Sequence, residues 1–153
     1  MFRTADILLI ALASGLAGCD GGDPSAWPRG MQQPNAAIVL TTAPVSPAVD
    51  GVLVEPAWRT AARVTHFISD DGKPADPPTI ARLTYDRNAL YVGLTCMEPR
   101  MNNLVTEAGQ RDGPVEQDDS ITVILAPDVV GGDNIKIFSV SAANVKRDAD
   151  ANG

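Results

Sequence analysis

Aspartate and asparagine residues near the end of the chain have the spacing of oxygen ligands for a hard cation. Asp148, Asp150 and Asn152 occupy alternate positions, and Gly153 follows them directly. Carboxylate and amide oxygens at this spacing around a glycine turn form the first half of an EF-hand-type calcium loop. The sequence ends before the glutamate that closes such a loop. The motif therefore suggests calcium as a candidate cofactor.

The residue types needed for catalysis are sparse. His66 is the only histidine, and no nucleophile-elbow motif, Cys/His metal cluster or glycine-rich phosphate loop accompanies it. Most acidic residues fall in predicted loops, where a solvated surface is the expected role rather than paired carboxylates in a cleft. The net charge of −7 argues against nucleic acid as a partner. We therefore expect a binding module and not an enzyme.

The N-terminus resembles a bacterial lipoprotein signal. Arg3 precedes an apolar stretch at 7–13 that is too short to span a bilayer, and Leu16-Ala17-Gly18-Cys19 follows. This pattern predicts a signal peptide over 1–18, lipidation of Cys19, and a location in the bacterial cell envelope with membrane contact through the lipid alone. An ordinary secretory signal with an incidental cysteine is the alternative. Residues 19–37 are rich in Gly, Pro, Ser and Gln and predict a flexible linker.

The remaining residues, 38–153, alternate in the manner of short strands. A hairpin at 79–96 is the clearest element, with Ala81, Leu83 and Tyr85 on one face and a turn at 86–88. Its second run places Cys96 on an apolar face, where a small buried residue is expected. Further strands are predicted at 38–40, 64–68, 121–126 and 135–142, and a helical turn at 55–62 begins with Pro56.

Regularly spaced strands with turn signals predict an all-β fold, an antiparallel β-sandwich. The chain stops on a turn signal after Asn144, without the strand that such a turn introduces. We therefore expect the sandwich to be incomplete at its C-terminus.

Several blocks, in order, resemble the N-terminal type of family 9 carbohydrate-binding module. The blocks are Val49-Asp50-Gly51 with Glu55-Pro56-Ala57-Trp58, Gly72-Lys73-Pro74-Ala75 with Thr79, Tyr85-Asp86 with Ala89-Leu90-Tyr91-Val92-Gly93, Gln117-Asp118-Asp119-Ser120, Phe138-Ser139-Val140, and Arg147-Asp148-Ala149 with Asn152-Gly153. The resemblance implies a jelly-roll-like sandwich, binding of poly- or oligosaccharide, and in some members a structural calcium. The resemblance also explains most of the residue pattern from Asp148 to Gly153 without requiring a bound metal.

Two features depart from the pattern of this family. Asn144 stands where the family usually has glycine, and asparagine can adopt the same left-handed conformation. Well-studied sugar-binding members hold the sugar between two tryptophan rings, whereas Trp58 is the only tryptophan of the predicted domain.

Three side chains are the candidates for contact with sugar. Trp58 is expected mainly in the core, because its helical turn is amphipathic. Tyr91 is either an exposed platform or part of a second packed layer. Arg82 can donate to sugar hydroxyls, although an ion pair with an acid such as Asp119 is the preferred role. Asp118 and Asp119 are expected to introduce a strand.

These patterns lead to one functional expectation and one alternative. The expected function is that of a carbohydrate-binding module on an envelope-anchored lipoprotein, which targets polysaccharide for a linked or neighbouring glycoside hydrolase or an uptake system. The alternative is a structural or interaction sandwich that does not bind sugar and stands at the front of a larger envelope protein.

Overall fold

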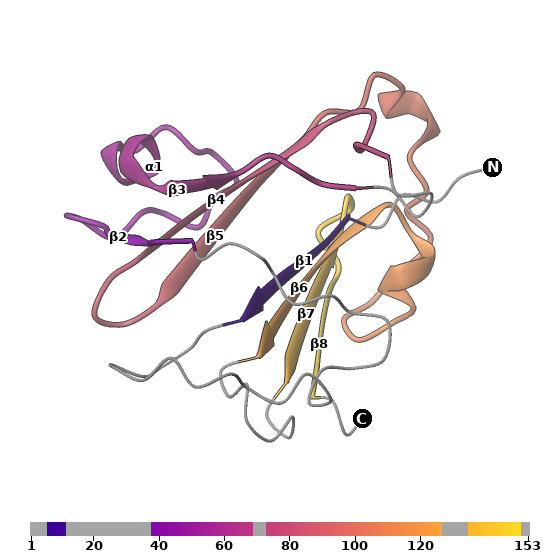
Figure 1. Ribbon diagram of the computed structural model, residues 1–153. Coiled ribbons are helices and arrows are strands. Elements are labelled where there is room, and N and C mark those ends of the chain that lie inside the picture. Colours follow the sequence, from indigo (N-terminus) through magenta and orange to yellow (C-terminus); the bar gives the residue numbers. More distant parts are fainter. Residues whose placement is uncertain (1–5, 12–37, 69–72, 127–134, 151–153) are drawn as a thin grey trace, which may run out of the picture. The chain divides into compact units, whose positions relative to one another are not determined.

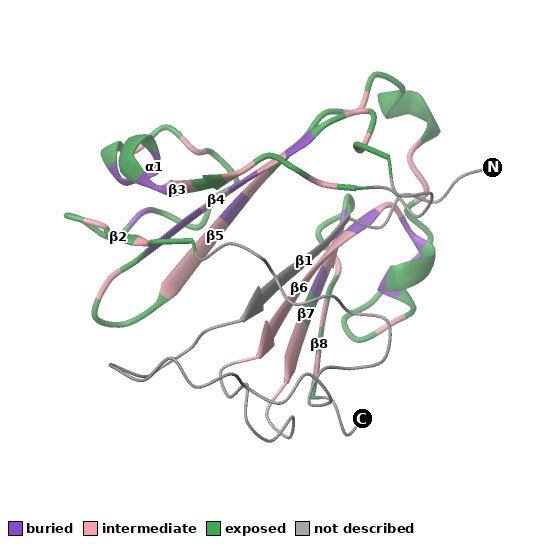
Figure 2. Cartoon of the chain, viewed as in Figure 1, coloured by how far each residue is buried: buried purple, intermediate pink, exposed green. Residues whose placement is uncertain are grey.

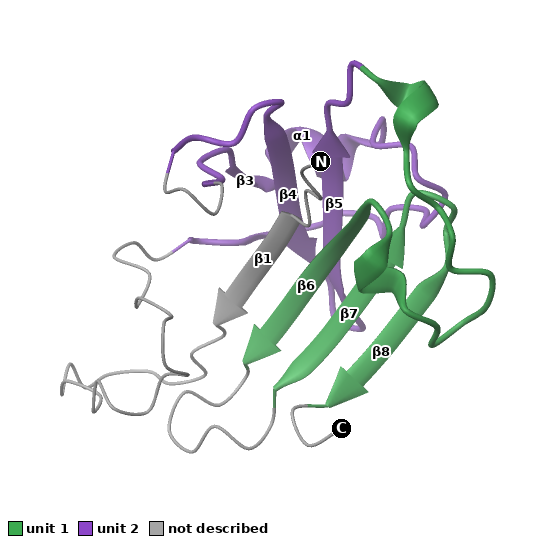
Figure 3. Cartoon of the chain, turned by 90° about the vertical axis from the view of Figure 1, so that its right-hand side faces the viewer, with its two compact units in different colours: residues 1–34, 100–153 green, residues 35–99 purple. Residues whose placement is uncertain are grey.

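The computed structural model describes the backbone of residues 6–11 and the whole of residues 38–68, 73–126 and 135–150 (Figure 1). Strands dominate this part of the chain, in two four-stranded sheets, and the prediction of an all-β fold is confirmed. The chain divides into two compact units, which Figure 3 colours separately. Unit 2 comprises residues 35–99, and unit 1 comprises residues 1–34 and 100–153. Among the described residues, no helix is long and apolar enough to cross a membrane.

The sheet of unit 2 is built around the predicted hairpin. Strand β4 (Thr79–Tyr85) pairs antiparallel with β5 (Leu90–Cys96) over its whole length. The opposite edge of β4 is shared by β3 (Ala62–Val64), antiparallel, and then by β2 (Thr41–Thr42), parallel. The hairpin is therefore confirmed. Its connection is four residues long, because Tyr85 pairs with Leu90 and Asp86 N–H donates to the Ala89 carbonyl at 3.0 Å.

Both faces of β4 and β5 are covered where the strands are central. Ala81 and Leu83, which share the face predicted to be buried, are 0% and 1% exposed. Figure 2 shows buried stretches, in purple, along β4. On the other face, helix α1 (Pro56–Thr60) places Trp58 against Gly93 of β5. Pro56 lies at the start of this helix, as predicted, where its missing N–H is not needed.

The sheet of unit 1 has the order β1-β6-β7-β8. Strands β6 (Ser120–Ala126), β7 (Lys136–Ser141) and β8 (Lys146–Asp150) pair antiparallel, and β1 (Asp6–Ala11) pairs parallel with β6. Two short 3₁₀ turns, η2 (Met101–Asn103) and η3 (Val115–Gln117), precede β6. Val115 of η3 is fully buried and anchors this segment.

The N-terminal strand β1 lies within the predicted signal peptide. Asp6–Ala11 is the outer strand of this sheet, beside β6. Cleavage after residue 18 stays a prediction, and Cys19 and the linker at 20–37 lie outside the described residues.

Several predicted boundaries were wrong. The first strand of unit 2 is Thr41–Thr42 and not 38–40, because Thr41 and Thr42 are the residues that pair with the last two residues of β4. Strand β3 covers Ala62–Val64 and ends before His66, which is exposed. The prediction that Cys96 is buried was also wrong: it is exposed, at the last position of β5.

The segment after β7 forms a turn and then a further strand. Asn144 has φ 61°, so the left-handed conformation expected for this residue is confirmed. The sequence predicted no strand after this turn. That prediction was wrong, because the backbone continues as β8, whose residues pair with β7 from Val140 to Lys136. β8 was not predicted because its residues are mostly charged, whereas hydrophobic alternation is the pattern that predicts strands.

Candidate functional site

An exposed aromatic ring lies on the sheet of unit 1. Phe138 of β7 is 47% exposed, although phenylalanine is usually buried. Val123 of β6 and Asp148 of β8 lie directly opposite it in the sheet. The ring borders an open depression of about 440 Å³, which we call the Phe138 surface; its lining residues are Lys136, Phe138, Arg147, Asp148, Ala149 and Asp150.

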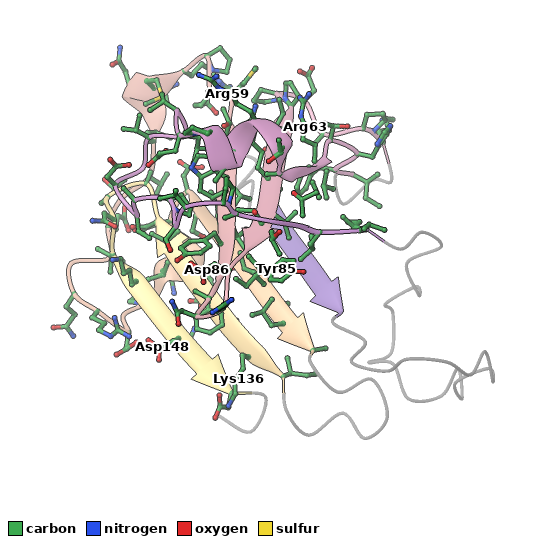
Figure 4. All side chains as sticks on the ribbon, turned by 90° about the vertical axis from the view of Figure 1, so that its left-hand side faces the viewer. Arg59, Arg63, Tyr85, Asp86, Lys136 and Asp148 are labelled. Atoms are coloured by element: carbon green, nitrogen blue, oxygen red, sulfur yellow. The ribbon has the colours of Figure 1, made fainter. Side chains whose placement is uncertain are left out.

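Charged side chains in ion pairs frame the Phe138 surface. Lys136 Nζ lies 2.8 Å from Asp150 Oδ1, across β7 and β8. Asp148 pairs with the guanidinium of Arg111 (Figure 4 labels Lys136 and Asp148). All of these side chains are largely exposed, so each pair adds little stability. The Lys136 ammonium and the carboxylates of Asp148 and Asp150 line the depression together with Phe138 and can exchange hydrogen bonds with a ligand.

The aspartates of the predicted calcium motif belong to this surface. Asp148 and Asp150 lie on strand β8 rather than in a loop, and their carboxylates form ion pairs with Arg111 and Lys136 respectively. An extended strand does not wrap around an ion as a calcium loop does. In the part of the chain that the structure describes, no group of three or more His, Cys, Asp or Glu residues is placed to hold a metal. Asn152 lies outside that part, and calcium binding stays a prediction.

Trp58 is a core residue. Its side chain is 5% exposed, and the ring carbon Cη2 lies 3.2 Å from the position of a Cβ atom on Gly93. The indole Nε1 has no hydrogen-bond partner among the described residues. A ring in this position cannot stack on a sugar without opening the core of unit 2.

Tyr91 is held by Asp86 at the hairpin turn. The Tyr91 hydroxyl donates to Asp86 Oδ2 at 2.9 Å, and the Ser46 hydroxyl donates to the same oxygen. Asp86 Oδ1 accepts the backbone N–H groups of Asn88 at 2.7 Å and Ala89 at 2.9 Å. The hydrogen bond from Ser46, followed by that from Asn88, lowers the pKa of Asp86 to about 2.

This arrangement gives Tyr91 a structural role. Its side chain is half-buried on the face that Trp58 and Leu53 cover at Gly93. Of the two alternatives open for Tyr91, the contacts favour packing over an exposed platform.

Arg82 lies in the middle of β4, directly opposite Arg63 of β3 and Gly93 of β5. Neither arginine forms an ion pair within the described residues. Arg82 and Asp119 belong to different units, so the ion pair expected between them stays a prediction.

Asp118 and Asp119 introduce β6, as expected, by binding the segment before them. Asp119 Oδ2 accepts the Val105 N–H at 2.7 Å. The Asp118 side chain is 2% exposed, and its Oδ1 accepts the N–H groups of Glu107 at 2.8 Å and Ala108 at 3.2 Å. Backbone N–H groups therefore satisfy both carboxylates.

The Phe138 surface was missed at the level of sequence, although a signal was present. Alternation along β7 places Phe138 with Lys136 on one face and Ile137 with Ser139 and Ser141 on the other. An aromatic residue that shares a strand face with lysine indicates a partly solvated face. The pairing of this face with charged β8 was not predictable, because β8 itself was not recognised.

Comparison with known proteins adds no further constraint. No protein-family model, curated protein or solved structure matches the chain. The resemblance to the carbohydrate-binding module rests on the sequence blocks alone.

Proposed function

We propose that the chain is the carbohydrate-binding module of an envelope-anchored lipoprotein, and that sugar binds at the Phe138 surface. The observation that carries the proposal is the exposed Phe138 ring framed by paired Lys136, Asp150, Asp148 and Arg111. An aromatic face stacks on the apolar face of a pyranose ring, and planar charged groups beside it exchange hydrogen bonds with hydroxyls.

The shape of the surface favours weak binding to an extended chain. A single ring in an open depression buries only one face of a sugar, so the affinity per site is expected near the millimolar range, about −4 kcal/mol. Binding at this strength suits a module that keeps a linked or neighbouring hydrolase, or an uptake system, close to polysaccharide. Repeated weak contacts along a polymer then raise the residence time.

The module has no catalytic role in this proposal. Lipidation of Cys19 would hold it on the envelope, so labelling with a radioactive fatty acid in the producing bacterium should be lost in Cys19→Ser. Retention of the label in that variant would contradict the anchor.

We also propose that the two sheets form a jelly-roll-like sandwich. Ala81 and Leu83 are almost fully buried on the face of β4 that is opposite α1, as expected for an inner face. An experimental structure of the mature protein would test this arrangement directly.

The test of sugar binding is affinity electrophoresis of the mature protein through gels that contain a panel of plant and microbial polysaccharides. Retardation is expected in at least one gel, and Phe138→Ala should abolish it. Tyr85→Ala is the matched control, because Tyr85 is also an exposed aromatic, at 40%, and lies in the other unit. No retardation by any glycan, or equal loss in both variants, would contradict the proposed site.

A structural or interaction role is the second candidate. The uncharged edge of β6 favours it, because proposed removal of β1 would leave this edge free to pair with another strand. Recovery of protein partners without any glycan binding would support this candidate.

A further inference from the structure

The two outer strands of the β6-β7-β8 sheet differ in character. β8 reads Lys-Arg-Asp-Ala-Asp and carries charges at every position except Ala149. Charged side chains on an edge strand prevent pairing with other chains. β6 reads Ser-Ile-Thr-Val-Ile-Leu-Ala, with no charge and no proline. Its composition is that of an internal strand, and an exposed edge of this kind readily pairs with another strand.

With the leader attached, β6 is an internal strand. Six consecutive residues of β1, Asp6–Ala11, pair with Ile121 to Ala126. The proposed cleavage after residue 18 removes β1 and leaves the backbone N–H and C=O groups on this edge of β6 unpaired. The linker that remains, 19–37, contains Pro24, Pro28 and Pro34 and has no apolar run that resembles β1.

We propose that, in the mature protein, β6 pairs antiparallel with β6 of a second copy of the chain. The proposal rests on the proposed removal of the leader and is independent of sugar binding. A two-fold axis at Val123 would bring Val123 opposite its own counterpart and Ile121 opposite Leu125 of the second copy. Val123, Ile121 and Leu125 would then each face an apolar side chain, Ile124 would face Thr122, and no like charges would meet.

The resulting dimer has one continuous sheet, in which each copy contributes β6, β7 and β8. Within the described residues, its two outer edges are the charged β8 strands, which oppose further pairing. The pairing therefore closes as a dimer rather than extending into a fibre.

Sedimentation equilibrium and hydrogen exchange on two forms of the protein test the dimer. The mature chain from residue 19, with Cys19→Ser, should be a dimer whose β6 amides exchange slowly. The chain of residues 1–153 with the same substitution should be a monomer, because β1 fills the edge. A mature chain that stays monomeric at all concentrations, or a leader-containing chain that dimerises equally well, would overturn the proposal.

A substitution at the two-fold axis gives a second test. Val123→Lys brings two ammonium groups together across the axis, and the dissociation constant should rise on the order of tenfold or more. Phe138→Ala, on the neighbouring strand, should leave the dimer intact even where it abolishes sugar binding. If Val123→Lys is folded by circular dichroism and still dimerises with unchanged affinity, the interface is elsewhere. If Val123→Lys does not fold, the comparison of the two chain lengths decides the question.

Discussion

Replacing Gly93 with alanine is expected to destabilise unit 2, because Leu53 and Trp58 fill the space above this glycine. A Cβ atom at position 93 would lie 2.8 Å and 3.0 Å from the two Cδ atoms of Leu53, and 3.2 Å from Cη2 of Trp58. Carbon atoms in packed interiors are separated by about 3.5 to 4.0 Å. The Leu53 side chain can rotate away, but the Trp58 ring is 5% exposed and cannot move without disturbing the core.

Two opposing effects set the magnitude. Overpacking of a core by one methyl group costs about 1 to 3 kcal/mol. Alanine also lowers the conformational entropy of the unfolded chain relative to glycine, which stabilises the folded state by about 0.4 to 1 kcal/mol. The difference between the two ranges spans about 0 to 2.6 kcal/mol, and their midpoints give an expected net loss in the free energy of unfolding of about 1.3 kcal/mol.

Urea denaturation followed by tryptophan fluorescence measures this loss. Gly109→Ala is the matched control, because a Cβ atom there meets nothing within 4 Å, and its stability should be unchanged or slightly higher. A Leu53→Ala background should relieve part of the penalty at position 93, with a coupling energy on the order of 1 kcal/mol.

Equal stability of Gly93→Ala and Gly109→Ala would refute the packing argument. The face of β5 that carries Tyr91 and Gly93 would then be open, and it would return as a candidate surface for sugar.

Three further predictions concern the polar contacts that hold loops and turns. Because the pKa of Asp86 is depressed, its contribution to stability is complete above pH 3.8, its ordinary pKa, and is lost as the pH falls toward about 2. Urea titrations across this range should show a smaller pH dependence of stability for Asp86→Asn. An unchanged pH dependence would contradict the pKa shift. Asp118→Ala leaves the buried N–H of Ala108 without its acceptor and should lower the free energy of unfolding by about 1 to 3 kcal/mol, measured by chemical denaturation. A loss below that of an exposed aspartate variant would show that water replaces the carboxylate. Asn144→Ala should lower the free energy of unfolding by about 1 kcal/mol, because alanine is strained at φ 61°, whereas Asn144→Gly should leave it unchanged. Thermal melts that rank these two variants in the opposite order would exclude a strained turn.

The sequence predicted the elements whose hydrophobic pattern is regular. The hairpin of β4 and β5, the strands β6 and β7, and the start of α1 at Pro56 all follow from alternation or from local backbone chemistry. The left-handed Asn144 was also predictable, because few residue types tolerate that conformation. Local preferences of this kind act over a few residues and can be read without a partner.

Tertiary pairing decided the rest, including the candidate site. β8 is charged and has no strand signal of its own, so it exists as a strand because β7 offers it a ladder of hydrogen bonds. That pairing places Asp148 opposite Phe138 and Asp150 opposite Lys136, which creates the Phe138 surface. Contacts distant in sequence likewise buried Trp58 against Gly93 and brought Ser46 to Asp86, the residue that holds Tyr91. Sequence periodicity determines which side chains share a strand face, but only the register between strands determines which residues meet across it.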